Sequence, residues 1–278
     1  MKKLVLVLVM IFVVMAGRTQ SFEGVIHWNM KMDITDPKIK AQMEEAKKKA
    51  SDPANQAKMK EMQAKMNDPQ FKAMMENNPQ MKAMMEKMTQ GNPADMMNNM
   101  MPKGMIIRVK DGNSLVTIDG GMMAGDVLHL KDKNESIHLD RQNKTYSIMN
   151  SGNAQGNPLG DATKPTVTKT SETAKILGYN CTKYVVVLTE RGQTVTQNLW
   201  ATTEIKDIDM KAFAKQRMGR GGQSMVYEGV DGIPLKIESS MKEGNMLMEC
   251  TEIKKESLNA ADFTIPSDYK ETKGIYGR

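Results

Sequence analysis

Methionine is the residue whose abundance and spacing point most clearly to chemistry in this chain. Residues 43–101 contain 14 of the 29 methionines in the 278-residue sequence. Many of them recur at positions i, i+3, i+4 and i+7, which places their thioethers on one stripe of a helix. Because methionine is unbranched and polarizable, such a stripe can re-pack around apolar ligands of different shapes. The predicted ligand-binding residues in this segment are Phe71, Met74, Met75, Met81, Met84, Met85 and Met88.

Two other interpretations of these methionines remain open. Soft thioethers select Cu(I), and pairs such as Met81 and Met84 would lie on one helical face, although the segment contains no histidine. The stripes can also be ordinary core. However, Leu, Ile and Val are almost absent from residues 40–100, and a core selected only for stability would use their better-defined rotamers. Hydrophobic-ligand binding is therefore the main prediction, with Cu(I) as the alternative.

The histidines and cysteines point less clearly to a chemical function than the methionines do. His129 and His138 are predicted to face each other on the outer side of a hairpin, where two imidazoles could begin a metal site. Two solvent-facing histidines are the favoured interpretation, since a third ligand is not evident. Cys181 and Cys250 either form a disulfide or are two small buried hydrophobic residues, and the sequence does not decide between these. We predict no metal or cofactor for this chain.

Signatures of catalysis are missing from the sequence. It contains no Gly-x-Ser-x-Gly elbow, no His-Glu-x-x-His helix and no Cys-x-x-Cys pair, and it has only three histidines. We therefore predict that the protein is not an enzyme. Its basic residues are scattered and only 5% of its residues are aromatic, which argues against binding to nucleic acid.

The methionine-rich segment is punctuated by Asp-Pro and Asn-Pro pairs. Asp or Asn is a preferred N-cap, and proline is tolerated at the first helical position. The pairs therefore predict four or five short helices between residues 36 and 102. They are Asp36-Pro37, Asp52-Pro53, Asp68-Pro69, Asn78-Pro79 and Asn92-Pro93.

Strand patterns precede and follow this segment. Strict alternation over residues 22–34 places Trp28, Met30 and Met32 on one apolar face, and these three complete the predicted ligand-binding set. Further strands are predicted at 105–110, 114–119, 126–130, 136–140, 145–149, 180–188, 194–201, 225–228, 233–241 and 245–253, with a helix at 209–218. The predicted fold class is α+β: a large curved antiparallel sheet, forming an incomplete barrel, with a methionine-rich helical insertion after the first strand.

The chain divides into four predicted parts. Residues 1–21 read as a signal peptide, because Lys2 and Lys3 precede an apolar run from 4 to 15. Residues 22–35 and 103–270 form the sheet domain, 36–102 the helical insertion and 271–278 a tail. We expect a periplasmic or secreted Gram-negative protein. No cysteine directly follows the apolar run, so a lipid anchor is not expected. The mature chain has no predicted transmembrane segment.

Several short patches resemble a family of exported Gram-negative proteins known only as a domain of unknown function. They are residues 22–26 (FEGVI), 103–108 (KGMIIR), 139–146 (LDRQNKTY), 176–181 (ILGYNC), 199–204 (LWATTE), 232–238 (GIPLKIE) and 263–269 (FTIPSDY). The resemblance implies a lipoprotein-carrier (LolA-like) fold, in which helices cover the hydrophobic concave face of an incomplete barrel. It brings no catalytic residues. The methionine-rich repeats are similar to the STI1-type helical domains of co-chaperones, which hold hydrophobic segments in a groove.

These inferences predict a non-enzymatic periplasmic binding or carrier protein. Its ligand would be a lipid, a lipoprotein acyl chain or an apolar peptide, held between methionine side chains and the apolar face of the sheet. The partner would be that ligand or an outer-envelope lipoprotein. The alternatives are a Cu(I)-binding protein and a structural envelope protein that has no ligand.

Overall fold

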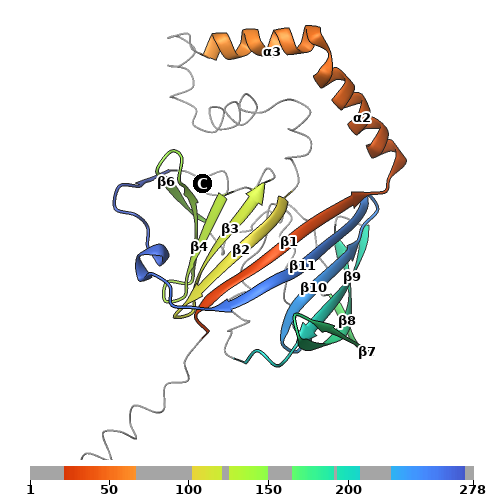
Figure 1. The fold of residues 1–278 in the computed structure, drawn as a ribbon, viewed down its shortest axis with the longest axis vertical. Helices are drawn as coiled ribbons and strands as arrows, with labels where there is room; N and C mark the ends of the chain where they lie inside the picture. The colour runs from red at the N-terminus through yellow and green to blue at the C-terminus, as the bar shows by residue number, and fades with distance from the viewer. Residues whose placement is uncertain are drawn as a thin grey trace, which may run out of the picture.

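The computed structural model describes residues 22–66, 102–120, 125–149, 165–190, 193–206 and 227–272. Within these ranges twelve strands form one sheet, in the order β12-β6-β5-β4-β3-β2-β1-β11-β10-β9-β8-β7 (Figure 1). Neighbouring strands are antiparallel except for the parallel pair β12–β6. The strands are β1 (Gly24–Ile34), β2 (Pro102–Lys110), β3 (Asn113–Gly120), β4 (Gly125–Leu130), β5 (Glu135–Asp140), β6 (Thr145–Met149), β7 (Thr166–Ile176), β8 (Tyr179–Glu190), β9 (Gln193–Thr202), β10 (Ile233–Ser240), β11 (Gly244–Lys255) and β12 (Lys270–Glu271).

Three short helices complete the described chain: α2 (Pro37–Ser51), α3 (Pro53–Met66) and the 3-10 helix η2 (Ala260–Phe263). The first two predicted N-caps are confirmed. The Asp36 side chain accepts a hydrogen bond from the backbone N–H of Lys38 at 2.7 Å, and the Asp52 side chain accepts one from Ala54 at 2.7 Å. Helix α2 continues from the end of β1, and both helices extend beyond the sheet (Figure 1). Most side chains of α2 are exposed, so α2 does not supply a cover for the sheet.

The predicted fold class is wrong. The described chain is nearly all β, one large sheet with two short α-helices, and is not an α+β fold with a helical insertion. The physical reason is that the long alternating strands bury the apolar side chains, whereas α2 buries few. The remainder of the expected insertion, residues 67–101, and the expected helix at 209–218 lie outside the described residues. The division into domains stays a prediction.

The predicted strands correspond to strands of the structure, with one exception. Tyr227 and Glu228, at the end of the strand predicted for 225–228, are not in a strand. Conversely, β7 and the two-residue strand β12 were not predicted, and they form the two edges of the sheet.

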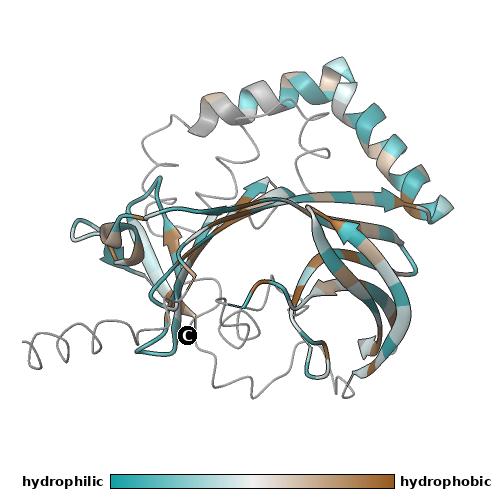
Figure 2. Cartoon of the chain, turned by 60° about the horizontal axis from the view of Figure 1, so that its bottom comes forward, coloured by the Kyte–Doolittle hydropathy of each residue, from teal (hydrophilic) through white to brown (hydrophobic). Residues whose placement is uncertain are grey.

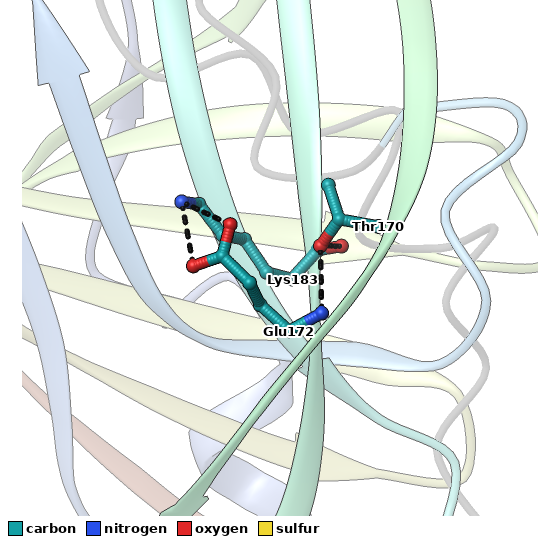
Figure 3. Close-up of polar contacts among 3 residues, drawn as sticks. All are labelled: Thr170, Glu172 and Lys183. Carbon is teal, nitrogen blue, oxygen red and sulfur yellow. Dashed lines mark hydrogen bonds and ion pairs between the residues drawn. The ribbon is translucent and has the colours of Figure 1, made fainter.

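Strand β7 is held to β8 partly by side chains. Its register with β8 shifts between Lys169 and Thr173. There the Thr170 hydroxyl donates to the Lys183 carbonyl at 3.0 Å and accepts from the Glu172 N–H at 3.2 Å. The Lys183 ammonium donates to both Glu172 carboxylate oxygens (Figure 3). A bulge and charged side chains of this kind make an edge strand a poor template for further strand pairing.

The sheet bends into an arch, so it has a concave inner face and a convex outer face (Figure 2). The larger core lies on the inner face. It includes Ile26, Trp28, Met30, Met105, Ile107, Tyr184, Val186, Leu199, Ile237 and Met248. A smaller core lies on the outer face of β3–β5, beneath η2 and the rest of the C-terminal segment 256–272. It consists of Leu115, Leu128, Ile137, Leu139 and Phe263.

Candidate functional site: the methionine-lined inner face

Three rows of cross-strand neighbours run over the inner face where β1 meets β11. The Trp28 row consists of Met105, Trp28 and Cys250. The Met30 row consists of Met30, Met248, Ile237, Leu199 and Tyr184. The Met32 row consists of Met32, Met246, Ser239, Gln197 and Val186. Directly opposed residues of an antiparallel pair have Cβ atoms about 4.5–5.5 Å apart, so each row is a line of neighbouring side chains.

Burial decreases along β1 from one row to the next. Trp28 is 5% exposed and Met30 is 9% exposed, whereas Met32 and its partner Met246 are only partly buried. The apolar surface is therefore closed at the Trp28 row and partly open at the Met32 row. The open end is the one at which β1 leads into α2 (Figure 1).

A close approach of two strands holds the closed end in place. A Cβ atom added at Gly104 of β2 would lie 2.6 Å from the carbonyl oxygen of Trp28, so any larger residue would push the strands apart. The next residue, Met105, lies opposite Trp28 and is 2% exposed. Glycine at 104 thus lets Met105 pack against Trp28.

The structure describes only part of the predicted site, and the ligand-binding role of its residues stays a prediction. Trp28, Met30 and Met32 lie together on the inner face, as their alternation predicted. The other predicted site residues, Phe71, Met74, Met75, Met81, Met84, Met85 and Met88, lie outside the described residues. Sequence reasoning missed Met105, Met246 and Met248 as neighbours of these β1 residues. Alternation placed each of them in a strand, but the pairing register that makes them neighbours is a tertiary property.

Polar side chains enter the Met32 row from β9 and β10. Ser239 is 1% exposed and Gln197 is 2% exposed. The Tyr227 hydroxyl donates a hydrogen bond of 2.7 Å to Gln197 Oε1. Among the residues that the structure describes, Ser239 Oγ has no hydrogen-bond partner. The row therefore combines partly exposed apolar side chains with buried uncharged polar ones.

Charged groups occur at the end of the neighbouring Met30 row, where they are paired. The Tyr184 hydroxyl donates to Asp231 Oδ2 at 3.1 Å, and the Lys169 ammonium donates to the same oxygen at 3.0 Å. The hydrogen bond from Lys169 lowers the pKa of Asp231. These charged side chains are more than half exposed, so they lie at the rim of the inner face.

The two cysteines are not bonded to each other. Cys181 and Cys250 are free and buried, and they lie on β8 and β11, with β9 and β10 between them. A disulfide needs Cα atoms within about 7 Å, whereas three strand spacings of about 4.8 Å separate these positions. Burial raises the pKa of the Cys250 thiol to about 12, which disfavours the nucleophilic thiolate. The sequence left two interpretations open, and the structure shows that Cys181 and Cys250 are small buried hydrophobic residues and not a disulfide.

The predicted histidine arrangement is wrong in its register and in its face. His129 lies opposite Ser136, and His138 lies opposite Val127, so the two imidazoles are diagonal neighbours. His129 is 4% exposed, and its Nδ1 lies 3.2 Å from Ser136 Oγ. Both residues lie on the inner face, because His129 also pairs with Ser114 on the same face as Val116. Among the described residues, no three His, Cys, Asp or Glu side chains gather closely enough to hold a metal ion.

Comparison with known proteins places the chain in a family. Residues 113–269 match the family described as Domain of unknown function (DUF4412). The chain belongs to this family. The DUF4412 match runs from β3 to the C-terminal segment, so it includes Ser239, Met246 and Met248 but not the β1 part of the site.

The comparisons with curated proteins and with solved structures add little about this DUF4412 protein. No curated protein matches it significantly. Among solved structures, LprF from Mycobacterium bovis is similar at a TM-score of 0.27 and 11% identity, covering 63% of this chain and 85% of LprF. A likeness of this size does not establish a common fold, so the LolA-like resemblance stays a prediction. None of the helices in the described part of the chain has the length and hydropathy needed to span a membrane.

Proposed function

We propose that this protein binds or carries a hydrophobic ligand in the periplasm and is not an enzyme. The ligand is a lipid, an acyl chain or an apolar peptide, and it lies against the Met32 row. The observation that carries the proposal is the partial exposure of Met32 and Met246 directly beside the buried Met30 and Met248. Sites for apolar ligands are lined mostly by hydrophobic side chains, with a few polar groups that orient the ligand.

Two further features support this proposal. Methionine side chains adapt to ligands of different shapes, and five of them lie in the three rows: Met30, Met32, Met105, Met246 and Met248. The basic residues and apolar run at the start of the sequence support export to the periplasm.

Cu(I) binding is a second candidate, because one feature of the register favours it. Met30 lies directly opposite Met248, and Met32 lies directly opposite Met246, so four thioethers share one small area of the inner face. Thioether sulfur is a soft ligand that favours Cu(I) over harder cations.

Paired substitutions at Met32 and Met246 distinguish the two functions. Changing both to Gln removes apolar contact, whereas changing both to Leu retains it and removes the sulfur. Since each buried methylene contributes about 0.8 kcal/mol, the Gln variant should lose tenfold or more in affinity for a fluorescent acyl probe, and the Leu variant only a few-fold. If the site binds Cu(I), the Leu variant should instead lose the ability to compete with a Cu(I) chelator.

Leu247→Gln is the matched control, because Leu247 lies on the same strand but faces the opposite side, across from Lys31. It should bind the acyl probe as the wild type does. Wild-type protein that binds no acyl probe, or a Gln pair that binds as well as wild type, would overturn the hydrophobic-ligand proposal.

A further inference from the structure

Ser239 is the most unusual polar residue on the inner face. It is 1% exposed, and its Oγ has no hydrogen-bond partner among the described residues. A buried hydroxyl without a partner is costly, and native proteins contain few of them. Such a group points to a partner that binds from outside the described chain.

The position of Ser239 shows where that partner would lie. Ser239 pairs with Met246 on one side and with Gln197 on the other, so it stands between the partly exposed methionines and the buried end of the Met32 row. Its neighbour on the same face, Ile237, is 3% exposed. A molecule that covers Met32 and Met246 would thus lie next to Ser239.

The surroundings of Ser239 also limit the charge of that molecule. The members of the Met32 row are uncharged. The charged pair at the end of the neighbouring Met30 row, Lys169 and Asp231, is exposed and lies at the rim. An ionised carboxylate or phosphate buried beside Ser239 would lose its hydration without gaining a cation, whereas an ester, ether or hydroxyl oxygen would need only a hydrogen bond.

We propose that the ligand is an uncharged lipid with an oxygen-bearing head, such as a glycerol ester or a long-chain alcohol, and that Ser239 hydrogen-bonds to this oxygen. This inference rests on the proposed hydrophobic-ligand function and adds the class of lipid that the site selects. The aliphatic chain next to the head lies over Met246 and Met32.

The experiment measures competition against a fluorescent acyl probe by 1-monopalmitoylglycerol and by palmitate at neutral pH. Wild-type protein should bind monopalmitoylglycerol at least tenfold more tightly than palmitate. Ser239→Ala should weaken the binding of monopalmitoylglycerol about three- to tenfold, as expected for one lost hydrogen bond, and leave that of palmitate unchanged. Ser240→Ala is the matched control, because Ser240 is the next residue and is exposed on the other face.

A second measurement tests whether the hydroxyl is unpartnered in the free protein. Ser239→Ala should melt at the same temperature as the wild type or higher when no lipid is present. A lower melting temperature together with unchanged lipid affinity would mean that a buried water or another part of the chain satisfies Ser239, which overturns this inference. Equal binding of both lipids also overturns it while leaving the proposed function intact. Wild-type protein that binds neither lipid nor the probe overturns both.

Discussion

Strands β8–β11 and strands β4–β6 belong to one sheet but place their apolar side chains on opposite faces. In β8–β11 the inner face carries Tyr184, Leu199 and Met248. In β4–β6 the inner face carries polar side chains such as His129 and Ser147, which are buried. The apolar core residues of these strands, such as Leu128, Ile137 and Leu139, point outward, beneath the C-terminal segment. The hydrophobic side of a sheet is therefore a local property, set by whatever segment covers each part of it.

The cover over the outer face of β4–β6 is held in place mainly by polar contacts. The C-terminal segment crosses the outer face of β4–β6 and is tied down by polar contacts. Glu23, which directly precedes β1, accepts a hydrogen bond from the Leu258 N–H at 2.6 Å, and the Thr272 N–H donates to the Tyr146 carbonyl at 2.8 Å. Lys144 pairs with Asp268 at 2.8 Å. The smaller core thus depends on a segment that is distant in sequence from the strands it covers.

Removing the largest side chain of the smaller core should have the largest effect. Phe263→Ala should lower the free energy of unfolding by about 3–5 kcal/mol, because Phe263 is 5% exposed and its loss leaves a cavity. Hydrogen exchange should accelerate in β4–β6 and change little in β8–β11. Leu177→Ala, at a site that is 44% exposed, is the control and should change stability little. Uniform acceleration over all strands would show that the two regions unfold as one unit.

An intermediate effect is expected at the ion pair beside the smaller core. Asp126 is 4% exposed and pairs with Arg141, whose pKa is raised by this hydrogen bond. Arg141→Ala would leave the carboxylate buried without its partner, at a cost of about 1–3 kcal/mol in denaturant unfolding. Adding Asp126→Asn to that variant should restore part of the loss, since the uncharged amide is cheaper to bury. Equal stability of the wild type and the Arg141 variant would contradict a role for this pair.

The smallest effect should be a pH dependence at Glu23, which connects β1 with the C-terminal segment. Hydrogen bonds from Lys110 and from the Leu258 N–H lower the pKa of Glu23 below 4.5. A carboxyl whose pKa is lowered by folding stabilises the protein above its unfolded pKa, and this contribution disappears as pH falls through the lower folded pKa. Melting temperatures of the wild type and Glu23→Gln should therefore differ at pH 7 and converge below about pH 4. A difference that stays constant down to pH 3 would exclude this linkage.

Much of the strand content and the starts of α2 and α3 could be predicted from the sequence, whereas the fold class and the edge strands could not. Between the predicted strands 105–110 and 114–119, Asp111 and Gly112 have φ angles of 52° and 79°, as a tight hairpin turn requires. Strand β7 was missed because its sequence, TVTKTSETAKI, is mostly polar, and only its pairing with β8 makes it a strand. The fold class was wrong because Asp-Pro caps indicate where helices such as α2 and α3 begin, but not whether those helices bury enough apolar surface to contribute to the core.

The candidate site, too, could be predicted only in part from the sequence. Alternation by itself determined that Trp28, Met30 and Met32 share a face, because successive side chains of a strand point to opposite sides. It also placed Met246, Met248 and Ser239 in strands far along the chain. Only the tertiary structure decided that these residues are neighbours and that the face they share is the inner one. Register and curvature depend on which strands pair and on what covers them, and neither is a local property of the sequence.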